Sequence, residues 1–213
     1  PDPVIEEKTD VIVKVKAVGI CGSDIARYRN LGPYVKGNVW GHEFAGEVVE
    51  VGEAVTNVKV GDRVVGCPNL VCHECDACKS GHPARCESLN TIGAYVPGAF
   101  AEYIKMPAVN LIRMSDEMTY EQGSLVEPAT VAIHGLYQTS IKMGHEVAVV
   151  GCGNIGLMCI QWAKAFGAKT VYALDIDDAQ LQTAKAFGAD VLINSSDIDF
   201  HDEIRKYGNG VDL

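Results

Sequence analysis

The chain has 213 residues, of which 47% are hydrophobic and 22% are charged, and its formal net charge is −10 at pH 7. This composition is typical of a globular protein with a buried core, and the sequence has no cluster of Lys and Arg that would hold nucleic acid or an anionic membrane surface. No apolar run is long enough for a membrane span, and the first residues have neither the basic start nor the apolar stretch of a signal peptide, so we expect a cytoplasmic protein.

The first half of the chain is predicted to be rich in β-strands. Residues 11–20 alternate apolar and polar side chains in the manner of a half-buried strand. Residues 44–51, 62–66 and 99–105 are further runs of β-branched or aromatic residues bounded by glycine or proline.

The stretch from residue 67 to residue 90 has neither the alternation of a strand nor the periodicity of a helix, and four cysteines lie close together in it. Their spacing is C-x2-C-x2-C-x7-C, formed by Cys72, Cys75, Cys78 and Cys86. Four thiolates at this spacing can converge on one tetrahedral ion without long-range folding, and they leave no open coordination position. The spacing therefore predicts a structural zinc that holds a lobe with too few apolar residues to hold itself. A redox cluster or an iron–sulfur site is the alternative. Three neighbouring residues are surplus to four ligands and are not expected to bind the ion, with substitution for one of the four as the alternative: Cys67, His73 and His82.

From about residue 129 the pattern changes to strands that alternate with helices. The predicted strands are 146–150, 170–174 and 191–193, and the predicted helices are 154–166 and 178–187. This βαβαβ order predicts a parallel sheet with helices on its faces. Both helices end in the hexapeptide Ala-Lys-Ala-Phe-Gly-Ala, in which Gly167 and Gly188 suit the left-handed position just after a helix.

A glycine-rich turn joins the first of these strands to its helix. Residues 151–156 read G-C-G-N-I-G, and Asp175 stands nineteen residues further on, at the end of the next strand. In this context G-x-G-x-x-G predicts a dinucleotide site. Gly151 permits the tight turn, Gly153 lets the backbone reach the pyrophosphate, and Gly156 allows close packing of the helix. The alternative is a βαβ unit that binds no nucleotide.

The helix after this turn supplies the groups that would bind the cofactor. Asn154 and Ile155 lie at its N-terminus, where free backbone N–H groups can face an anion. Asp175 is expected to accept hydrogen bonds from the ribose hydroxyls and to repel a 2′-phosphate, which favours NAD over NADP.

Two domains are expected, one at 1–128 with the four-cysteine lobe at 67–90, and a second at 129–213. A doubly wound dinucleotide fold needs six strands. The sequence ends at residues 211–213, where a fourth strand would start. We therefore expect only the first half of the nucleotide-binding domain to be present.

Three further segments carry residues of the types that bind metals. Cys21 lies in G-I-C-G-S-D, His42 and Glu43 lie in G-H-E-F-A-G-E, and Glu127 lies in L-V-E-P-A-T. Taken singly, each of these residues has a structural explanation. A lone cysteine is most often a small buried apolar residue, and an isolated His or Glu is usually exposed or a hydrogen-bonded core residue. Together with the four-cysteine lobe and the nucleotide fingerprint, in this order, they resemble the zinc-containing medium-chain dehydrogenase/reductase family from about Val11 to the last residue.

This resemblance implies a GroES-like β-barrel domain followed by a partial Rossmann domain, which is an α/β fold with a β-rich first part. By that likeness Cys21 and His42 bind a catalytic zinc, and Glu127, Glu43 or both complete the shell, with water or substrate in the open position. Such a zinc lowers the pKa of the substrate hydroxyl, and NAD accepts the hydride. Ser23 matches the hydroxyl that begins a proton relay in relatives, and a turn serine that bonds its own backbone is the alternative.

The resemblance also bears on the substrate. The carboxylate at position 127 resembles the sorbitol and polyol branch, and C-G-S-D-I-A-R at 21–27 with N-S-S at 194–196 resembles galactitol-1-phosphate dehydrogenases. Sorbitol-type relatives carry a histidine five residues after the first zinc cysteine, where this chain has Ala26. The next residue, Arg27, could meet a sugar phosphate, and an exposed structural arginine is the alternative.

The family likeness thus implies an oxidoreductase with two zinc ions per chain, an alcohol or sugar-alcohol substrate, and a homodimer or homotetramer at full length. Two alternatives stay open, namely a non-catalytic nucleotide-binding protein on the same scaffold and an inactive fragment of such an enzyme. Two zinc ions per intact chain would favour catalysis, and one would favour the non-catalytic protein.

Overall fold

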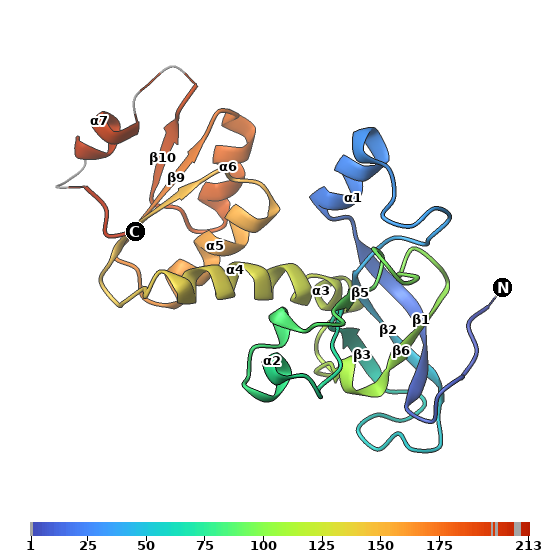
Figure 1. Cartoon of the computed structure of the whole chain (residues 1–213). Helices are drawn as coiled ribbons and strands as arrows, with labels where there is room; N and C mark the ends of the chain where they lie inside the picture. The colour runs from blue at the N-terminus through green and yellow to red at the C-terminus, as the bar shows by residue number, and fades with distance from the viewer. Residues whose placement is uncertain (1, 197, 199, 207–209) are drawn as a thin grey trace. The chain divides into compact units, whose positions relative to one another are not determined.

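The computed structural model describes residues 2–196, 198, 200–206 and 210–213 (Figure 1). The chain forms two compact units, Pro1–Glu127 and Pro128–Leu213. Within the described residues, no helix has both the length and the apolar character that a membrane crossing requires.

The first unit is built on an antiparallel sheet of five strands in the order β6-β1-β2-β3-β7. Its strands are β1 (Asp10–Gly19), β2 (Glu43–Val51), β3 (Arg63–Gly66), β6 (Tyr103–Pro107) and β7 (Leu111–Arg113). Buried side chains from these strands share one core, which includes Val11, Val13, Phe44, Val64 and Met106. The strands predicted at 11–20, 44–51 and 62–66 are confirmed to within one residue at each end.

The strand predicted at 99–105 is wrong at its start, because β6 begins only at Tyr103. The backbone N–H groups of Ala99 and Phe100 donate instead to the carbonyls of Gly41 and Trp40, each at 2.8 Å. This segment is therefore held by the loop that precedes β2 and does not join the sheet ladder.

The remaining elements of the first unit are short. They are α1 (Gly22–Ala26), the π-helix η1 (Arg27–Leu31), β4 (Asn69–Leu70), α2 (Asp76–Lys79), η2 (Pro83–Arg85), β5 (Asn90–Thr91), η3 (Ala108–Asn110) and α3 (Tyr120–Ser124). Strands β4 and β5 pair and close the four-cysteine lobe at its base. Between residues 69 and 91, all of which the structure describes, Cys86 is the single buried residue. The lobe therefore has no apolar core of its own.

The second unit contains a parallel sheet in the order β10-β9-β8. Its elements are α4 (Val126–Gln138, which starts at the end of the first unit), β8 (Glu146–Val150), α5 (Asn154–Ala165), β9 (Thr170–Asp175), α6 (Asp178–Ala186), β10 (Val191–Asn194) and α7 (Phe200–Arg205). The predicted βαβαβ order is confirmed. Residues 211–213 form no strand, but the Ala148 N–H donates to the Leu213 carbonyl at 2.8 Å, so the segment lies alongside β8.

Both faces of this sheet are covered, as is usual for parallel strands. Val171 and Ala173 of β9 pack on the side of α5 and α6, which contact each other, whereas Tyr172 and Leu174 pack on the opposite side with Ile204 of α7 (Figure 1). The glycines after α5 and α6 have φ of +84° and +107°, which confirms the predicted left-handed helix ends at Gly167 and Gly188.

Candidate metal centres and nucleotide-binding turn

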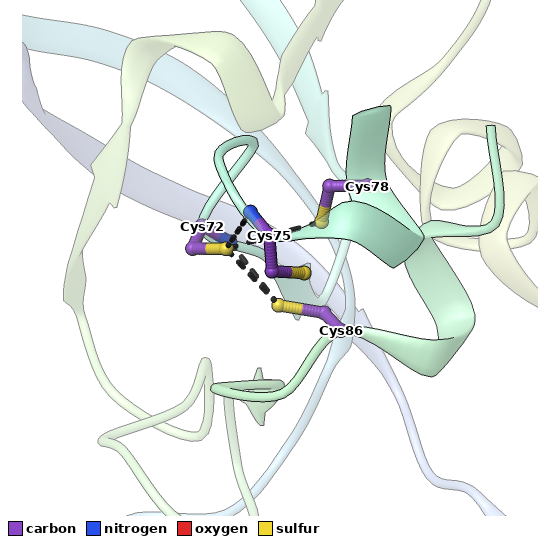
Figure 2. A group of neighbouring side chains, drawn as sticks. All are labelled: Cys72, Cys75, Cys78 and Cys86. Carbon is purple, nitrogen blue, oxygen red and sulfur yellow. Dashed lines mark hydrogen bonds between the residues drawn. The ribbon is translucent and has the colours of Figure 1, made fainter. Parts of the chain in front are cut away.

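The four cysteines of the lobe form one group of sulfur atoms. The Sγ atoms of Cys72, Cys75, Cys78 and Cys86 lie within 4.8 Å of one another, and their side chains converge (Figure 2). The Sγ–Sγ distance is 3.6 Å between Cys86 and Cys72 and 4.0 Å between Cys72 and Cys78. A tetrahedral zinc with Zn–S bonds of about 2.3 Å needs sulfur atoms roughly 3.8 Å apart. The donor set therefore fits one zinc ion. Three neighbouring candidates lie outside the group: Cys67, His73 and His82.

A tight turn positions the first two thiols. His73 has φ of +60°, and the N–H groups of Glu74 and Cys75 both donate to Cys72 Sγ, at 3.4 and 3.3 Å. These hydrogen bonds lower the pKa of Cys72 to about 6. Desolvation and the side-chain hydrogen bonds that Cys78 shares with neighbouring cysteines, which favour its protonated form, raise the pKa of Cys78 to about 12. Zinc binding to this group would therefore release protons, because all four ligands must be thiolates.

We expect removal of zinc to expose residues 67–90 to proteases. Between residues 69 and 91 the lobe has one buried residue, so the free energy of metal binding is most of the free energy that folds it. Limited proteolysis with and without a strong chelator, with zinc content measured on the same samples, tests this. Cleavage sites in the second unit should be unaffected and serve as the internal control. Unchanged cleavage within 72–86 after measured loss of zinc would contradict the prediction.

A second group of metal-ligand types forms in the first unit from two segments of the chain. Ligand atoms of Cys21, His42 and Glu43 lie within 4.8 Å of one another. Cys21 caps the N-terminus of α1, and its backbone N–H donates to Oδ2 of the buried Asp24 at 3.0 Å. Glu43 is the first residue of β2 and pairs directly with Gly19, near the end of β1. The sheet ladder itself thus brings the two segments together.

Two glycines whose role was not predicted from the sequence allow Cys21, His42 and Glu43 to come together. A Cβ atom on Gly19 would lie 2.3 Å from Oε2 of Glu43, so the carboxylate occupies space that only glycine leaves free. Gly41 has φ of +90°, and a Cβ there would lie 2.6 Å from the ring of Phe100. His42 therefore follows a turn that both backbone conformation and packing restrict to glycine.

Two carboxyl groups lie in the electrostatic field of His42. Burial raises the pKa of Glu43, which is 8% exposed, while His42 and a hydrogen bond with the Cys21 thiol act in the opposite direction. Burial also raises the pKa of Glu127, which His42 lowers and Glu43 raises. Glu127, in the first turn of α4, lies outside the group of three. One thiol, one imidazole and one carboxylate are a donor set that fits a zinc ion with an open fourth position.

A cavity of about 200 Å³ lies beside His42 in the first unit. Its wall includes Ser23 of α1, Trp40 before β2 and the loop at 91–95 that follows the four-cysteine lobe. The Asn38 side-chain amide donates to the carbonyls of Ala94 and Val96, at 3.0 Å each, and so ties these segments together. Trp40 and the loop could not be predicted from the sequence, because residues so far apart in the chain share no local pattern.

The glycine-rich turn has the geometry that its sequence predicts. Gly151 has φ of +89°, and a Cβ on Gly156, in the first turn of α5, would lie 1.9 Å from the Gly151 carbonyl oxygen. A Cβ on Gly153 would meet no atom within 4 Å, so the space beside it is open. Asn154 and Ile155 are the first two residues of α5.

Asp175 fastens this turn to the end of β9. Its Oδ2 accepts the N–H of Cys152 at 2.6 Å, and its Oδ1 accepts the N–H of Asp177 at 3.0 Å. These hydrogen bonds hold the pKa of Asp175 below its usual value, so the carboxylate is charged at neutral pH. The contact with the turn was not predicted from the sequence.

Comparison with known proteins covers nearly the whole chain. Residues 7–116 match the alcohol dehydrogenase GroES-like domain, and residues 154–213 match the zinc-binding dehydrogenase family. The chain is 41% identical to sorbitol dehydrogenase of Bacillus subtilis (strain 168), over 96% of the chain and 60% of the relative.

Solved structures show the same similarity. Galactitol-1-phosphate dehydrogenase from Escherichia coli superposes with a TM-score of 0.92 at 35% identity, over 97% of this chain and 60% of that one. A zinc-binding dehydrogenase from Sinorhizobium meliloti 1021, bound to NADP, gives 0.88 at 34% identity, over 95% and 58%. The chain thus spans about three fifths of the length of these relatives.

Proposed function

Because the chain belongs to the zinc-dependent medium-chain alcohol and polyol dehydrogenase family, we propose that the protein oxidises a small alcohol or polyol by hydride transfer to NAD. The observation that carries this proposal is the group of Cys21, His42 and Glu43, of which His42 lines a cavity. An open metal site beside a cavity is what zinc-assisted alcohol oxidation requires, and a purely nucleotide-binding protein does not need one.

In this proposal Cys21, His42 and Glu43 hold a catalytic zinc, and the four-cysteine lobe holds a structural one. The catalytic ion, when bound, supplies a Lewis acid that lowers the pKa of the substrate hydroxyl. Ser23 lines the same cavity as His42, which supports a role for its hydroxyl in relaying the proton that the substrate hydroxyl loses towards solvent. NAD, when bound, would accept the hydride from the carbinol carbon, so the products would be a carbonyl compound, NADH and one proton.

The full-length enzyme, loaded with zinc, provides the direct test. We expect two zinc ions per chain and formation of NADH with at least one polyol, secondary alcohol or sugar-alcohol phosphate. Zinc-loaded protein that binds NAD but oxidises none of these alcohols would contradict the proposed function.

The choice of NAD over NADP is proposed to depend on Asp175, whose charge would repel a 2′-phosphate. In the full-length enzyme, Asp175→Ser combined with Ile176→Arg should shift the ratio of kcat/KM values towards NADP by at least about tenfold, since a charged hydrogen bond contributes about 1.5–3 kcal/mol. Ile176 is 72% exposed, so an arginine fits there. Affinity for NAD should also fall, because the hydrogen bond to Cys152 is lost.

Kinetics with both cofactors decide the matter, and Ile176→Arg alone is the control. The single variant gains the arginine but retains the repelling carboxylate, so its ratio should move less than that of the double variant. A native enzyme that already prefers NADP would show that this role of Asp175 is wrong.

A further inference from the structure

One side chain at the end of β10 joins this strand to the loop that follows Asp175. Asn194 is the last residue of β10 and pairs with Asp175, the last residue of β9, in the parallel ladder (Figure 1). Its side-chain Nδ2 donates to Oδ1 of Asp178, in the first turn of α6, at 2.7 Å and to the Ile176 carbonyl at 3.5 Å. Asn194 therefore holds the loop between β9 and α6 from the side of the neighbouring strand.

The hydrogen-bond partners of Asn194 fix the orientation of its amide. A carboxylate and a carbonyl only accept hydrogen bonds, so the atom that faces Asp178 and Ile176 must be Nδ2. On the other side, Oδ1 accepts the Ser196 backbone N–H at 3.1 Å and the Ser196 hydroxyl at 2.7 Å. Rotation of the amide would set acceptor against acceptor, so both ends of the side chain are held in one arrangement.

The loop that Asn194 holds also sets the position of the Asp175 carboxylate. Oδ1 of Asp175 accepts the N–H of Asp177, two residues into this loop, whereas Oδ2 accepts the N–H of Cys152 in the glycine-rich turn. Asp177 in turn caps α6, because its Oδ1 accepts the Ala179 N–H at 2.8 Å. One oxygen of Asp175 thus depends on the turn and the other on the loop. A shift of the loop would therefore displace the carboxylate.

Hydrogen bonds, rather than apolar packing, decide where this loop lies. Ile176 is 72% exposed, and Asp177 and Asp178 are exposed as well. Asp175, Asp177 and Asp178 place three carboxylates within four consecutive residues. Like charges this close repel one another, so the loop needs N–H donors to stay closed. For Asp178 the donor is the Asn194 amide.

We propose that Asn194 is a positioning residue for the cofactor, which acts through Asp178 and the loop to hold the Asp175 carboxylate where it accepts hydrogen bonds from the adenosine ribose. This inference rests on the proposed function, in which Asp175 binds that ribose, and it adds a residue from a third segment of the chain to the site. Loss of the hydrogen bond between Asn194 and Asp178 should therefore weaken recognition of the ribose hydroxyl and not nucleotide binding in general.

Calorimetric titration of the full-length enzyme with ADP and with 2′-deoxy-ADP isolates the ribose contact. The two ligands differ by the 2′-hydroxyl, so the ratio of their Kd values reports on its hydrogen bond with Asp175, and a general loss of stability or a change in charge cancels. We expect the native enzyme to bind ADP at least about fivefold more tightly than 2′-deoxy-ADP. Asn194→Asp, whose carboxylate faces that of Asp178, should reduce this ratio to about twofold or less, close to the ratio of Asp175→Ala.

An exchange of the two side chains tests whether the hydrogen bond itself is responsible. In Asn194→Asp combined with Asp178→Asn, the amide and the carboxylate trade places, the net charge is that of the native chain, and the side chain at 194 still accepts from Ser196. The native ratio of Kd values should return to within about twofold.

Two further variants keep the result interpretable. Gln182→Glu makes the same amide-to-carboxylate change at an exposed position of α6, and it should leave the ratio unchanged. Asp178→Ala removes the acceptor from an exposed position, and it should lower the ratio in the same direction even if Asn194→Asp folds poorly.

Equal losses of affinity for ADP and 2′-deoxy-ADP in Asn194→Asp would show a merely structural role and overturn the proposal. So would a double variant whose ratio stays as low as that of Asn194→Asp. A native enzyme that oxidises alcohols with NAD but binds both nucleotides equally, or neither, would also overturn it and leave the proposed function intact. Conversely, an enzyme that oxidises no alcohol would contradict the proposed function, while a ratio that responds to these variants would still support the role of Asn194.

Discussion

Replacing Cys21 by alanine in the full-length enzyme is expected to remove one zinc ion per chain and nearly all alcohol oxidation, and to leave NAD binding intact. The thiol belongs to the group with His42 and Glu43, whereas the groups proposed to contact NAD lie at 151–175. A Lewis acid contributes several kcal/mol to such a reaction, so turnover should fall by about a thousandfold or more. Zinc analysis, steady-state kinetics and NAD titration on one preparation provide the three measurements.

Cys67→Ala is the matched control, because Cys67 is exposed and lies outside both groups of ligands. It should retain both zinc ions and full turnover.

The contributions of the two carboxylates to zinc binding can be distinguished in the same way. Glu43 lies in the group of three and Glu127 outside it, so Glu43→Gln should lower zinc content more than Glu127→Gln. A Cys21→Ala enzyme with normal turnover would contradict the zinc mechanism.

Two alanine substitutions in the glycine-rich turn should both weaken NAD binding, but for different physical reasons. Gly156→Ala places a methyl group 1.9 Å from a backbone oxygen, so the turn or α5 must shift. Overpacking of this kind costs about 1–3 kcal/mol, and the variant should lose both stability and affinity for NAD. Gly153→Ala meets no protein atom within 4 Å and should fold normally. It should nevertheless bind NAD at least about tenfold more weakly, because the methyl group keeps the pyrophosphate from the backbone.

Denaturant unfolding and NAD titration distinguish the two effects. Gly135→Ala is the control, since a Cβ at this position in the middle of α4 also has open space. It should raise the free energy of unfolding by about 0.5–1 kcal/mol and leave NAD affinity unchanged. Normal NAD affinity in Gly153→Ala would show that the cofactor does not approach this glycine.

Local patterns predicted most of the secondary structure. The strands and helices of the second unit follow from periodicity and from the glycines that end them, and the four cysteines lie close enough in sequence for spacing alone to bring them together. The start of β6 was wrong because Ala99 and Phe100 bond to a loop almost sixty residues earlier, and no local signal records such a partner.

The same limit applies to the site beside His42. The spacing of Cys21 from His42 carries no information about distance in space, and the family likeness alone suggested that they meet. The roles of Gly19 and Gly41 depend on the atoms that a side chain there would strike, which only the packed structure reveals. Arg27 lines the cavity beside His42 with its Nε buried, and this placement is likewise a property of the packed structure.

The pairing of Gly19 with Glu43 bears on how each group of ligands selects its ion. The position of the Glu43 carboxylate depends on strand pairing that does not need a metal ion. The group of Cys21, His42 and Glu43 should therefore keep the same shape with different ions. It should discriminate among divalent ions by coordination geometry, and cobalt, which accepts the same tetrahedral arrangement, should replace zinc there more readily than larger ions that demand six ligands. The four sulfur atoms on a coreless lobe impose little shape of their own. They should select by the softness of the ligands, so that cadmium competes best at the lobe.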